Sequence, residues 1–187
     1  MTRFCLVRHG QTDWNVEGRY TGQSDIPLNA AGRQQARQLA GLLKGEPFAA
    51  VYASDLMRAR ETAEIIAGCL QLPVRTDPRL REINQGEWEG LHVDTIKARY
   101  AALWQQRASD PSSARAPAGE TVGEVAERVS AALDEIARGC PEGSILIVAH
   151  GLSLATVLCR ARNAPIQQVY QLIPDNTTPV WVTWEGR

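Results

Sequence analysis

Two histidine–glycine pairs are the clearest candidates for chemistry in this sequence. His9-Gly10 follows a short apolar run near the N-terminus, and His150-Gly151 follows a second run far along the chain. A neutral imidazole is a competent nucleophile near pH 7, and a glycine after it allows a tight turn and close approach of a ligand to the backbone. Each histidine could equally do no more than end a strand with a polar group.

Two arginines lie close to the same positions. Arg8 directly precedes His9, and Arg58 lies about one turn into the helix expected after the second apolar run. A guanidinium presents a rigid fork that fits phosphate oxygens, and a helix N-terminus adds backbone donors. Considered alone, Arg58 could be an ordinary solvated helix residue. Together with the two histidines, these arginines indicate chemistry on a phosphoryl group.

Alternating apolar runs and helical periodicities predict the elements that carry these residues. Strands are expected at residues 3–7, 49–53, 73–76, 144–149 and 180–184. Helices are expected at 36–43, after Ser54 as a cap, at 93–106, after the capping box Thr121–Glu124, and from 151 through 158. Residues 79–91 show no periodicity, and 107–119 are expected to be a surface loop. This alternation predicts an α/β sandwich with a largely parallel sheet.

Such a sheet would bring the two histidines together. Ligands of open α/β sheets bind outside the carboxyl ends of the strands, and both histidines directly follow expected strands. Residues 144–149 are almost continuously apolar, which is typical of a central strand covered on both faces. We therefore expect His9 and His150 to meet at one edge of the sheet.

Length and composition indicate one globular domain over residues 1–187. Hydrophobic residues make up 44% of the chain and charged residues 22%, which argues against disorder. The formal net charge of −1 argues against a dedicated nucleic-acid-binding protein. No apolar run approaches the roughly 18 residues that a membrane span needs, and the N-terminal run is too short for a signal peptide. We expect no membrane association.

The cysteines and histidines give no sign of a metal or disulfide framework. Four cysteines are widely and irregularly spaced, without a C-x-x-C pair, and free thiols suit a reducing cytoplasm. The three histidines include none paired at helix spacing, so a metal hydrolase is not expected. His92 stands outside any motif and is expected to be exposed. We expect no metal, no cofactor and a cytoplasmic location.

An ordered set of motifs carries a family resemblance. The segment from Leu6 to Asn15, LVRHGQTDWN, looks like the R-H-G-[EQ]-[ST]-x-x-N signature of the histidine phosphatase superfamily, which includes the cofactor-dependent phosphoglycerate mutases. The match continues in order through the segments GR (18–19), TGQ (21–23), SDLMRA (54–59), LRE (80–82), GEWEG (86–90), PAGET (117–121) and AHG (149–151). The resemblance implies a three-layer α/β/α sandwich with a mostly parallel, mixed sheet, as in phosphoglycerate mutases.

The resemblance also implies roles for individual residues. His9 would be the nucleophile that becomes a phosphohistidine, Glu82 the proton donor to the leaving oxygen, and Arg8, Arg58 and His150 would clamp the phosphoryl oxygens. The remaining phosphate-binding and substrate-binding positions would be Asn15, Thr21, Gly22, Gln23, Gly151 and Leu152. Phosphoryl transfer needs mainly positioning and positive charge, so these residue types agree with the chemistry.

Only the family pattern selects Glu82 as the acid. By residue type alone, Glu61, Glu87 and Glu89 are equally possible, and Glu82 itself could form no more than a surface salt bridge to Arg79 or Arg81. Trp88 is open between a substrate contact in the expected variable lid, residues 83–119, and a core residue.

Other nucleophile motifs do not fit their required context. Cys69 and Arg75 have cysteine-phosphatase spacing, but this cysteine would close a helix rather than lie between a strand and a helix. The segment GLSLA from Gly151 approximates a nucleophile elbow, yet no histidine follows it. No P-loop motif is present.

Within the family, the sequence favours a phosphatase. After Glu82 the chain reads Ile83-Asn84-Gln85, not the E-R-x-Y-G segment of the mutases, and Leu152 occupies the position where mutases usually carry asparagine. The short lid and the G-x-W-E-G segment are similar to α-ribazole phosphatases and broad-specificity phosphatases. We expect a phosphoric monoester hydrolase acting on a small phosphorylated metabolite, as a monomer or homodimer. A phosphoglycerate mutase and a non-catalytic phospho-ligand binding module are the alternatives.

Overall fold

A five-stranded sheet forms the centre of the protein. The structure is a computed structural model and describes residues 1–186. In this part of the chain the strands follow the order β3-β2-β4-β1-β5. β1 and β4 are parallel neighbours, β2 and β3 continue the parallel arrangement, and β5 runs antiparallel to β1 at the edge. The strands are β1 (Thr2–Arg8), β2 (Phe48–Ala53), β3 (Val74–Thr76), β4 (Ser144–Ala149) and β5 (Val180–Trp184).

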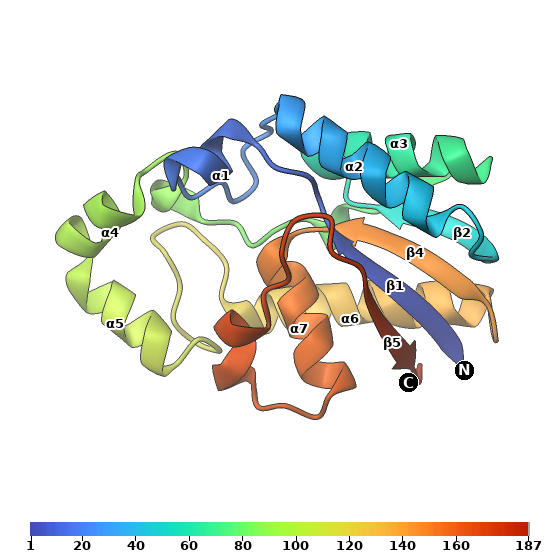
Figure 1. Cartoon of the computed structure of the whole chain (residues 1–187). Coiled ribbons are helices and arrows are strands. Elements are labelled where there is room, and N and C mark those ends of the chain that lie inside the picture. Colours follow the sequence, from blue (N-terminus) through green and yellow to red (C-terminus); the bar gives the residue numbers. More distant parts are fainter. Residues whose placement is uncertain (187) are drawn as a thin grey trace.

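Helices cover both faces of this sheet, which confirms the expected three-layer α/β/α sandwich (Figure 1). They are α2 (Ala30–Leu43) and α3 (Met57–Leu70) on one face, and α6 (Val122–Gly139) and α7 (Gly151–Ala161) on the other. Alternate residues of β1 belong to opposite cores: Phe4 and Leu6 pack towards α6 and α7, whereas Cys5 and Val7 pack towards α2 and α3. This two-sided burial explains why the central strands are continuously apolar.

A smaller group of elements stands away from the sheet, beyond the carboxyl ends of its parallel strands (Figure 1). α4 (Val93–Arg99) and α5 (Ala101–Ser109) enclose a separate cluster around the fully buried Trp88. The open question about Trp88 is thus answered in favour of a core residue, in this case the core of the lid. Shorter elements connect these parts: α1 (Asp13–Glu17) and the 3-10 turns η1 (Pro78–Leu80), η2 (Gly86–Trp88) and η3 (Ile166–Leu172).

The helical prediction for residues 93–106 is confirmed except at Tyr100, where the structure divides the range into two helices. The chain leaves the helical conformation at Tyr100, whose φ and ψ are −125° and 36°, because its ring packs against Trp88 at 5.9 Å between centroids. A second helix then continues to Ser109, so the expected surface loop from residue 107 begins only at Asp110. There, Asp110 accepts hydrogen bonds from two serine hydroxyls, and a proline follows it.

Ser54 does not cap the third helix. Its backbone N–H still bonds to the carbonyl of Val148 at 3.0 Å and so extends the strand pairing, and α3 begins only at Met57. The free N–H of Met57 instead donates to the Asp25 carboxylate at 2.6 Å, from a loop 32 residues earlier. Tertiary packing therefore supplied a cap that local sequence could not show. α1 and η3 were not anticipated from the sequence.

Candidate active site

The two histidines meet, as the strand pattern predicted. Because β1 and β4 are adjacent and parallel, their carboxyl ends place His9 and His150 side by side, with ring centroids 5.2 Å apart. Both side chains are buried, His9 to 4% exposure and His150 completely. The interpretation that each histidine merely ends its strand is therefore insufficient, since two imidazoles share one buried space.

The hydrogen bonds of His9 determine which ring nitrogen can react. Nδ1 lies 2.7 Å from the carbonyl oxygen of Gly10, and a carbonyl can only accept, so Nδ1 carries the hydrogen. Nε2 therefore holds a lone pair, and it accepts a hydrogen bond from Nε of Arg58 at 3.2 Å. The backbone of the same histidine is held by the side-chain amide of Asn176, which donates to its carbonyl at 2.6 Å. The unprotonated ring nitrogen of His9 therefore faces a guanidinium.

Burial and nearby positive charge keep both imidazoles neutral. Burial lowers the pKa of His9 well below its usual value, and the positive charges of Arg58 and Arg8 lower it further. The pKa of His150 is lowered for the same reasons, first by burial and then by Arg58 and its neighbours. Neutral rings have a lone pair to attack with and one N–H to donate, which nucleophilic and oxyanion-binding roles require.

Arg58 is a buried site residue, not a solvated helix residue. It lies second in α3, is 1% exposed, and donates from its two terminal nitrogens to the carbonyls of Ser24 and Gly22, each at 2.8 Å. Burial lowers the pKa of its guanidinium to about 10, although the charge of Glu82 acts in the opposite direction. The group remains a cation near neutrality. It joins the nucleophile to the loop that carries Thr21 and Gly22.

Several polar atoms around the histidines have no partner. Among the described residues, Nε of Arg8 and both ring nitrogens of His150 are buried without a hydrogen bond, while another nitrogen of Arg8 donates to the carbonyl of Pro174 at 3.1 Å. Buried polar atoms in native proteins nearly always have a hydrogen-bond partner. Several unpaired atoms close together therefore indicate a binding site for a ligand. Donors from an arginine and a histidine are suited to an oxyanion.

Glu82 is the acidic side chain that reaches this space. It lines the cavity, and its carboxylate accepts from the backbone N–H groups of Leu152 and Ser153, both at 3.1 Å, at the N-terminus of α7. The alternative that Glu82 forms only a surface salt bridge to Arg79 or Arg81 is wrong. Arg79 pairs with Asp77 and Glu135 instead, and Arg81 pairs with Asp55.

The competing glutamates are engaged elsewhere. Glu61 pairs with Arg33, and Glu87 accepts from the hydroxyl of Tyr100. Glu89 accepts from the backbone of Gln23 and from the hydroxyl of Ser24, so it holds a loop rather than facing the cavity. Of these four glutamates, Glu82 alone lines the cavity.

Most of the expected binding positions line one cavity of about 250 Å³. From the sequence prediction, the lining includes Arg8, His9, Asn15, Thr21, Gly22, Arg58, Glu82, Gly151 and Leu152. Two expected positions do not line it. The ring of His150 lies behind the lining, beside that of His9, and the side chain of Gln23 donates to the backbone carbonyl of Glu82 at 3.1 Å and so positions that residue. Sequence reasoning missed six lining residues: Arg19 and Tyr20 follow α1, Gln85 and Arg107 belong to the lid, and Tyr170 and Ile173 belong to the C-terminal segment.

The two glycines serve different purposes. A Cβ on Gly10 would lie 2.5 Å from the backbone oxygen of Gly32, so this glycine is needed for the contact with α2 rather than for a ligand. A Cβ on Gly151 would lie 3.0 Å from Cγ2 of Ile173 and 3.4 Å from Cζ of Arg8, so the missing side chain here leaves space first for Ile173 and only then for the guanidinium.

Residues 1–186 contain neither a cluster of metal-ligand side chains nor a candidate membrane-spanning helix. No three His, Cys, Asp or Glu side chains are grouped there in a way that could hold a metal ion. No helix in that part of the chain has the length and apolar character needed to cross a membrane. His92 is exposed, as expected, and caps α4.

Fold and cavity together define a class of protein: an α/β sandwich with a buried histidine pair and an arginine-lined cavity at the carboxyl edge of the sheet. Residues 4–187 match the model of the histidine phosphatase superfamily (branch 1), and the chain belongs to that superfamily. The family inferred from the motifs is confirmed.

Individual relatives carry the names of both phosphatases and a mutase. The chain is 41% identical over 166 residues to the probable phosphoglycerate mutase GpmB of Escherichia coli O139:H28 (strain E24377A / ETEC), which covers 88% of this chain and 77% of the relative. Among solved structures, a mycobacterial glucosyl-3-phosphoglycerate phosphatase aligns with a TM-score of 0.89 at 31% identity, over 97% and 90% of the two chains. The alpha-ribazole phosphatase from Shigella flexneri aligns with a TM-score of 0.88 at 30% identity, over 98% and 91%.

Proposed function

We propose that this protein hydrolyses a small phosphorylated metabolite through a phosphohistidine on His9, without help from a metal ion. The observation that carries the proposal is the direction of one lone pair. Nε2 of His9 is unprotonated beside Arg58 in the cavity, Arg8 with its unpaired Nε lines the same cavity, and His150, whose ring nitrogens are unpaired, lies next to His9. A phosphoryl group in this cavity would satisfy the orphaned donors and present its phosphorus to the nucleophile.

In the first step, Nε2 of His9 attacks phosphorus and forms an N–P bond while the bond from phosphorus to the ester oxygen breaks. The departing oxygen takes a proton from the carboxyl group of Glu82, and the alcohol leaves. Arg8, Arg58 and His150 donate to the equatorial oxygens, where the charge of the transition state is spread. Each such donor typically contributes about 10²–10³ in rate.

In the second step, the Glu82 carboxylate takes a proton from a water molecule, whose oxygen attacks the phosphohistidine. The N–P bond breaks, the imidazole regains its lone pair, and inorganic phosphate is released with Glu82 protonated again. The hydrogen bonds from the N-terminus of α7 hold the carboxylate in one place for both transfers. General acid–base help of this kind is worth roughly 10²–10⁴ in rate.

Phosphoglycerate mutase activity is the second candidate, and the 41% identity to GpmB is the observation that favours it. A mutase returns the phosphoryl group from the histidine to a bound hydroxyl and must exclude water meanwhile. The short segment that follows Glu82 and the leucine at 152 favour hydrolysis instead. The two reactions share the first step and differ only in the acceptor.

The experiment that tests the proposal is phosphate release from a panel of phosphomonoesters with a chelator present. The panel contains 3-phosphoglycerate with and without 2,3-bisphosphoglycerate, glucosyl-3-phosphoglycerate, phosphoserine and α-ribazole phosphate, and the control is His9→Ala. Release that resists the chelator and disappears in the control supports the proposal. Interconversion of phosphoglycerates without net release would establish the mutase. Tight phosphate binding without turnover of any ester would identify a binding module.

A further inference from the structure

Arg107 is a buried cation that the proposed reaction leaves unused. It lies in α5 and is 5% exposed. Its Nε donates to the hydroxyl of Tyr170 at 3.0 Å, one terminal nitrogen donates to Oε1 of Gln85 at 2.6 Å, and its Cζ lies 5.3 Å from the ring centroid of Trp88. All of these partners are neutral. Within residues 1–186 the guanidinium forms no ion pair, and Nη2 has no hydrogen-bond partner.

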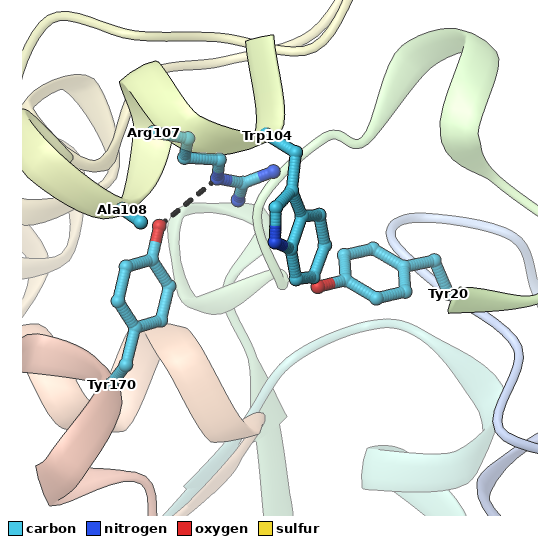
Figure 2. Close-up of a pocket in the computed structure, with 5 residues that line it drawn as sticks. All are labelled: Tyr20, Trp104, Arg107, Ala108 and Tyr170. Atoms are coloured by element: carbon cyan, nitrogen blue, oxygen red, sulfur yellow. Dashed lines mark hydrogen bonds between the residues drawn. The ribbon is translucent and has the colours of Figure 1, made fainter. Parts of the chain in front are cut away.

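This guanidinium lies where two cavities meet. One is the phosphoryl cavity that contains His9, and the other is a neighbouring cavity of about 260 Å³ lined by Tyr20, Trp104, Arg107, Ala108 and Tyr170. Tyr20, Arg107 and Tyr170 line both. Figure 2 shows the rings arranged around the guanidinium, with the bond from Arg107 to Tyr170 closing one side. A molecule bound at His9 would extend its leaving group into this second space.

The second cavity has the chemistry of a substrate subsite. Tyr20 and Trp104 form a rigid aromatic wall, with ring centroids 6.0 Å apart, and such a wall takes apolar or ring-shaped groups. A buried guanidinium with only neutral partners keeps an uncompensated charge in a region of low dielectric, where an arriving anion is bound strongly. Arginine also presents paired N–H groups that fit a carboxylate.

We propose that this aromatic cavity is the leaving-group subsite, and that Arg107 selects phosphate esters whose alcohol carries a carboxylate on an apolar or ring-shaped body. The inference rests on the proposed function, because it assigns the group that leaves from His9. Arg107 is a specificity-determining residue. It holds the carboxylate through Nη2, while Tyr20 and Trp104 contact the body of the alcohol.

Three benzyl phosphates that differ only in their para substituent, and through it in remote charge, test this subsite. They are 4-carboxybenzyl phosphate, benzyl phosphate and 4-(aminomethyl)benzyl phosphate, in which the para substituent is far enough from the ester oxygen to leave the three alcohols similarly reactive. In the wild-type protein, kcat/KM should be at least about tenfold higher for the carboxylate than for the neutral ester, the size of one charge-assisted hydrogen bond. The ammonium ester should be slower than the neutral one.

Two substitutions of Arg107 and one control separate this role from a structural one. Arg107→Gln should bring the carboxylate-to-neutral ratio close to one while benzyl phosphate is still hydrolysed, and Arg107→Lys should restore part of the ratio. Arg99→Gln removes an exposed arginine of α4 that lines neither cavity, and it should leave the ratio unchanged. Because each ratio is measured within one protein sample, a fraction of misfolded variant does not alter it.

The outcomes distinguish this proposal from the proposed function. Rapid, His9-dependent hydrolysis with no preference for the carboxylate in the wild type would overturn the subsite and leave the phosphatase intact. The same conclusion follows if Arg107→Gln keeps the full preference. If the wild type hydrolyses none of the three esters and none of the wider ester panel, both the subsite and the phosphatase proposal are overturned. If Arg107→Gln does not fold, the order of kcat/KM for the three esters in the wild type and the carboxylate-to-neutral ratio of Arg107→Lys still test the subsite.

Discussion

Replacing Arg58 by methionine should raise the pKa of His9. Burial is the larger cause of the low pKa of this imidazole, and the positive charge of Arg58 is the next. A methionine is apolar and of similar length, so it keeps the imidazole buried while it removes the charge. The protonated imidazole then loses a repulsive neighbour, and the titration of His9 should move towards higher pH.

The size of this shift follows from the geometry. Nε of Arg58 lies 3.2 Å from Nε2 of His9. Two unit charges about 4 Å apart interact with roughly 4 kcal/mol at an effective dielectric of 20 and roughly 1 kcal/mol in water. Since one pKa unit corresponds to about 1.4 kcal/mol, the shift should lie between about 1 and 3 units. The variant should also lose about 10²–10³ in kcat, because one donor to the transition state is gone.

The direct assay is an NMR pH titration of the histidine ring signals in the ligand-free protein. The chain has three histidines, and His92, which is exposed and lies outside the cavity, provides an internal control signal. Arg60→Met, an exposed position on the same helix, is the matched control variant, and Arg58→Lys should restore most of the wild-type titration. If His9 titrates at the same pH in Arg58→Met as in the wild type, the electrostatic reasoning is wrong.

Three further predictions follow from the same structure. Glu82→Gln should slow release of alkyl alcohols by about 10²–10⁴ but affect 4-nitrophenyl phosphate much less, and equal losses in steady-state assays would contradict the proton-donor role. His9 and His150 have lowered pKa values in the folded state, so below about pH 6.5 the unfolded chain binds protons that the folded protein does not. The free energy of unfolding should therefore fall by roughly 1.4 kcal/mol per pH unit for each histidine. Urea unfolding between pH 7 and 5 should show this dependence on pH, and His150→Asn should make it weaker. Gly86→Ala should destabilise the lid by about 1–3 kcal/mol, since φ is +50° there and a Cβ would lie 2.0 Å from a backbone oxygen; Gly45→Ala, with no atom within 4 Å, is the thermal-unfolding control.

Much of the sheet was predictable because the residue types along a strand depend on which of its faces are buried. A strand covered on both faces is apolar at nearly every position, so the apolar residues of 144–149 predicted a central strand. The capping box of Thr121 and Glu124 was equally local: each side chain bonds the backbone of the other residue, at 2.8 and 3.1 Å. The helix boundaries that failed, at Ser54 and Tyr100, depended on contacts with distant residues.

The site was predictable in its centre but not at its rim. His9 and His150 follow adjacent parallel strands, so topology alone brings them together. The ordered motifs added Glu82, which no local rule separates from neighbouring glutamates. Tyr170 and Ile173 come from a segment with no periodicity, and they enter the cavity only because that segment folds back beside α7.

By itself, then, the sequence determined the layers, the pairing of two histidines with two arginines, and the family. Those features depend on hydrophobic periodicity, on the alternation of strands with helices and on short motifs, all of which can be read along the chain. Tertiary structure alone decided the tautomer of His9 and, among the described residues, the neutral hydrogen-bond partners of Arg107. These depend on atoms from segments tens of residues apart that approach within hydrogen-bonding distance, and on the burial that results, and neither is encoded by the spacing of any one segment.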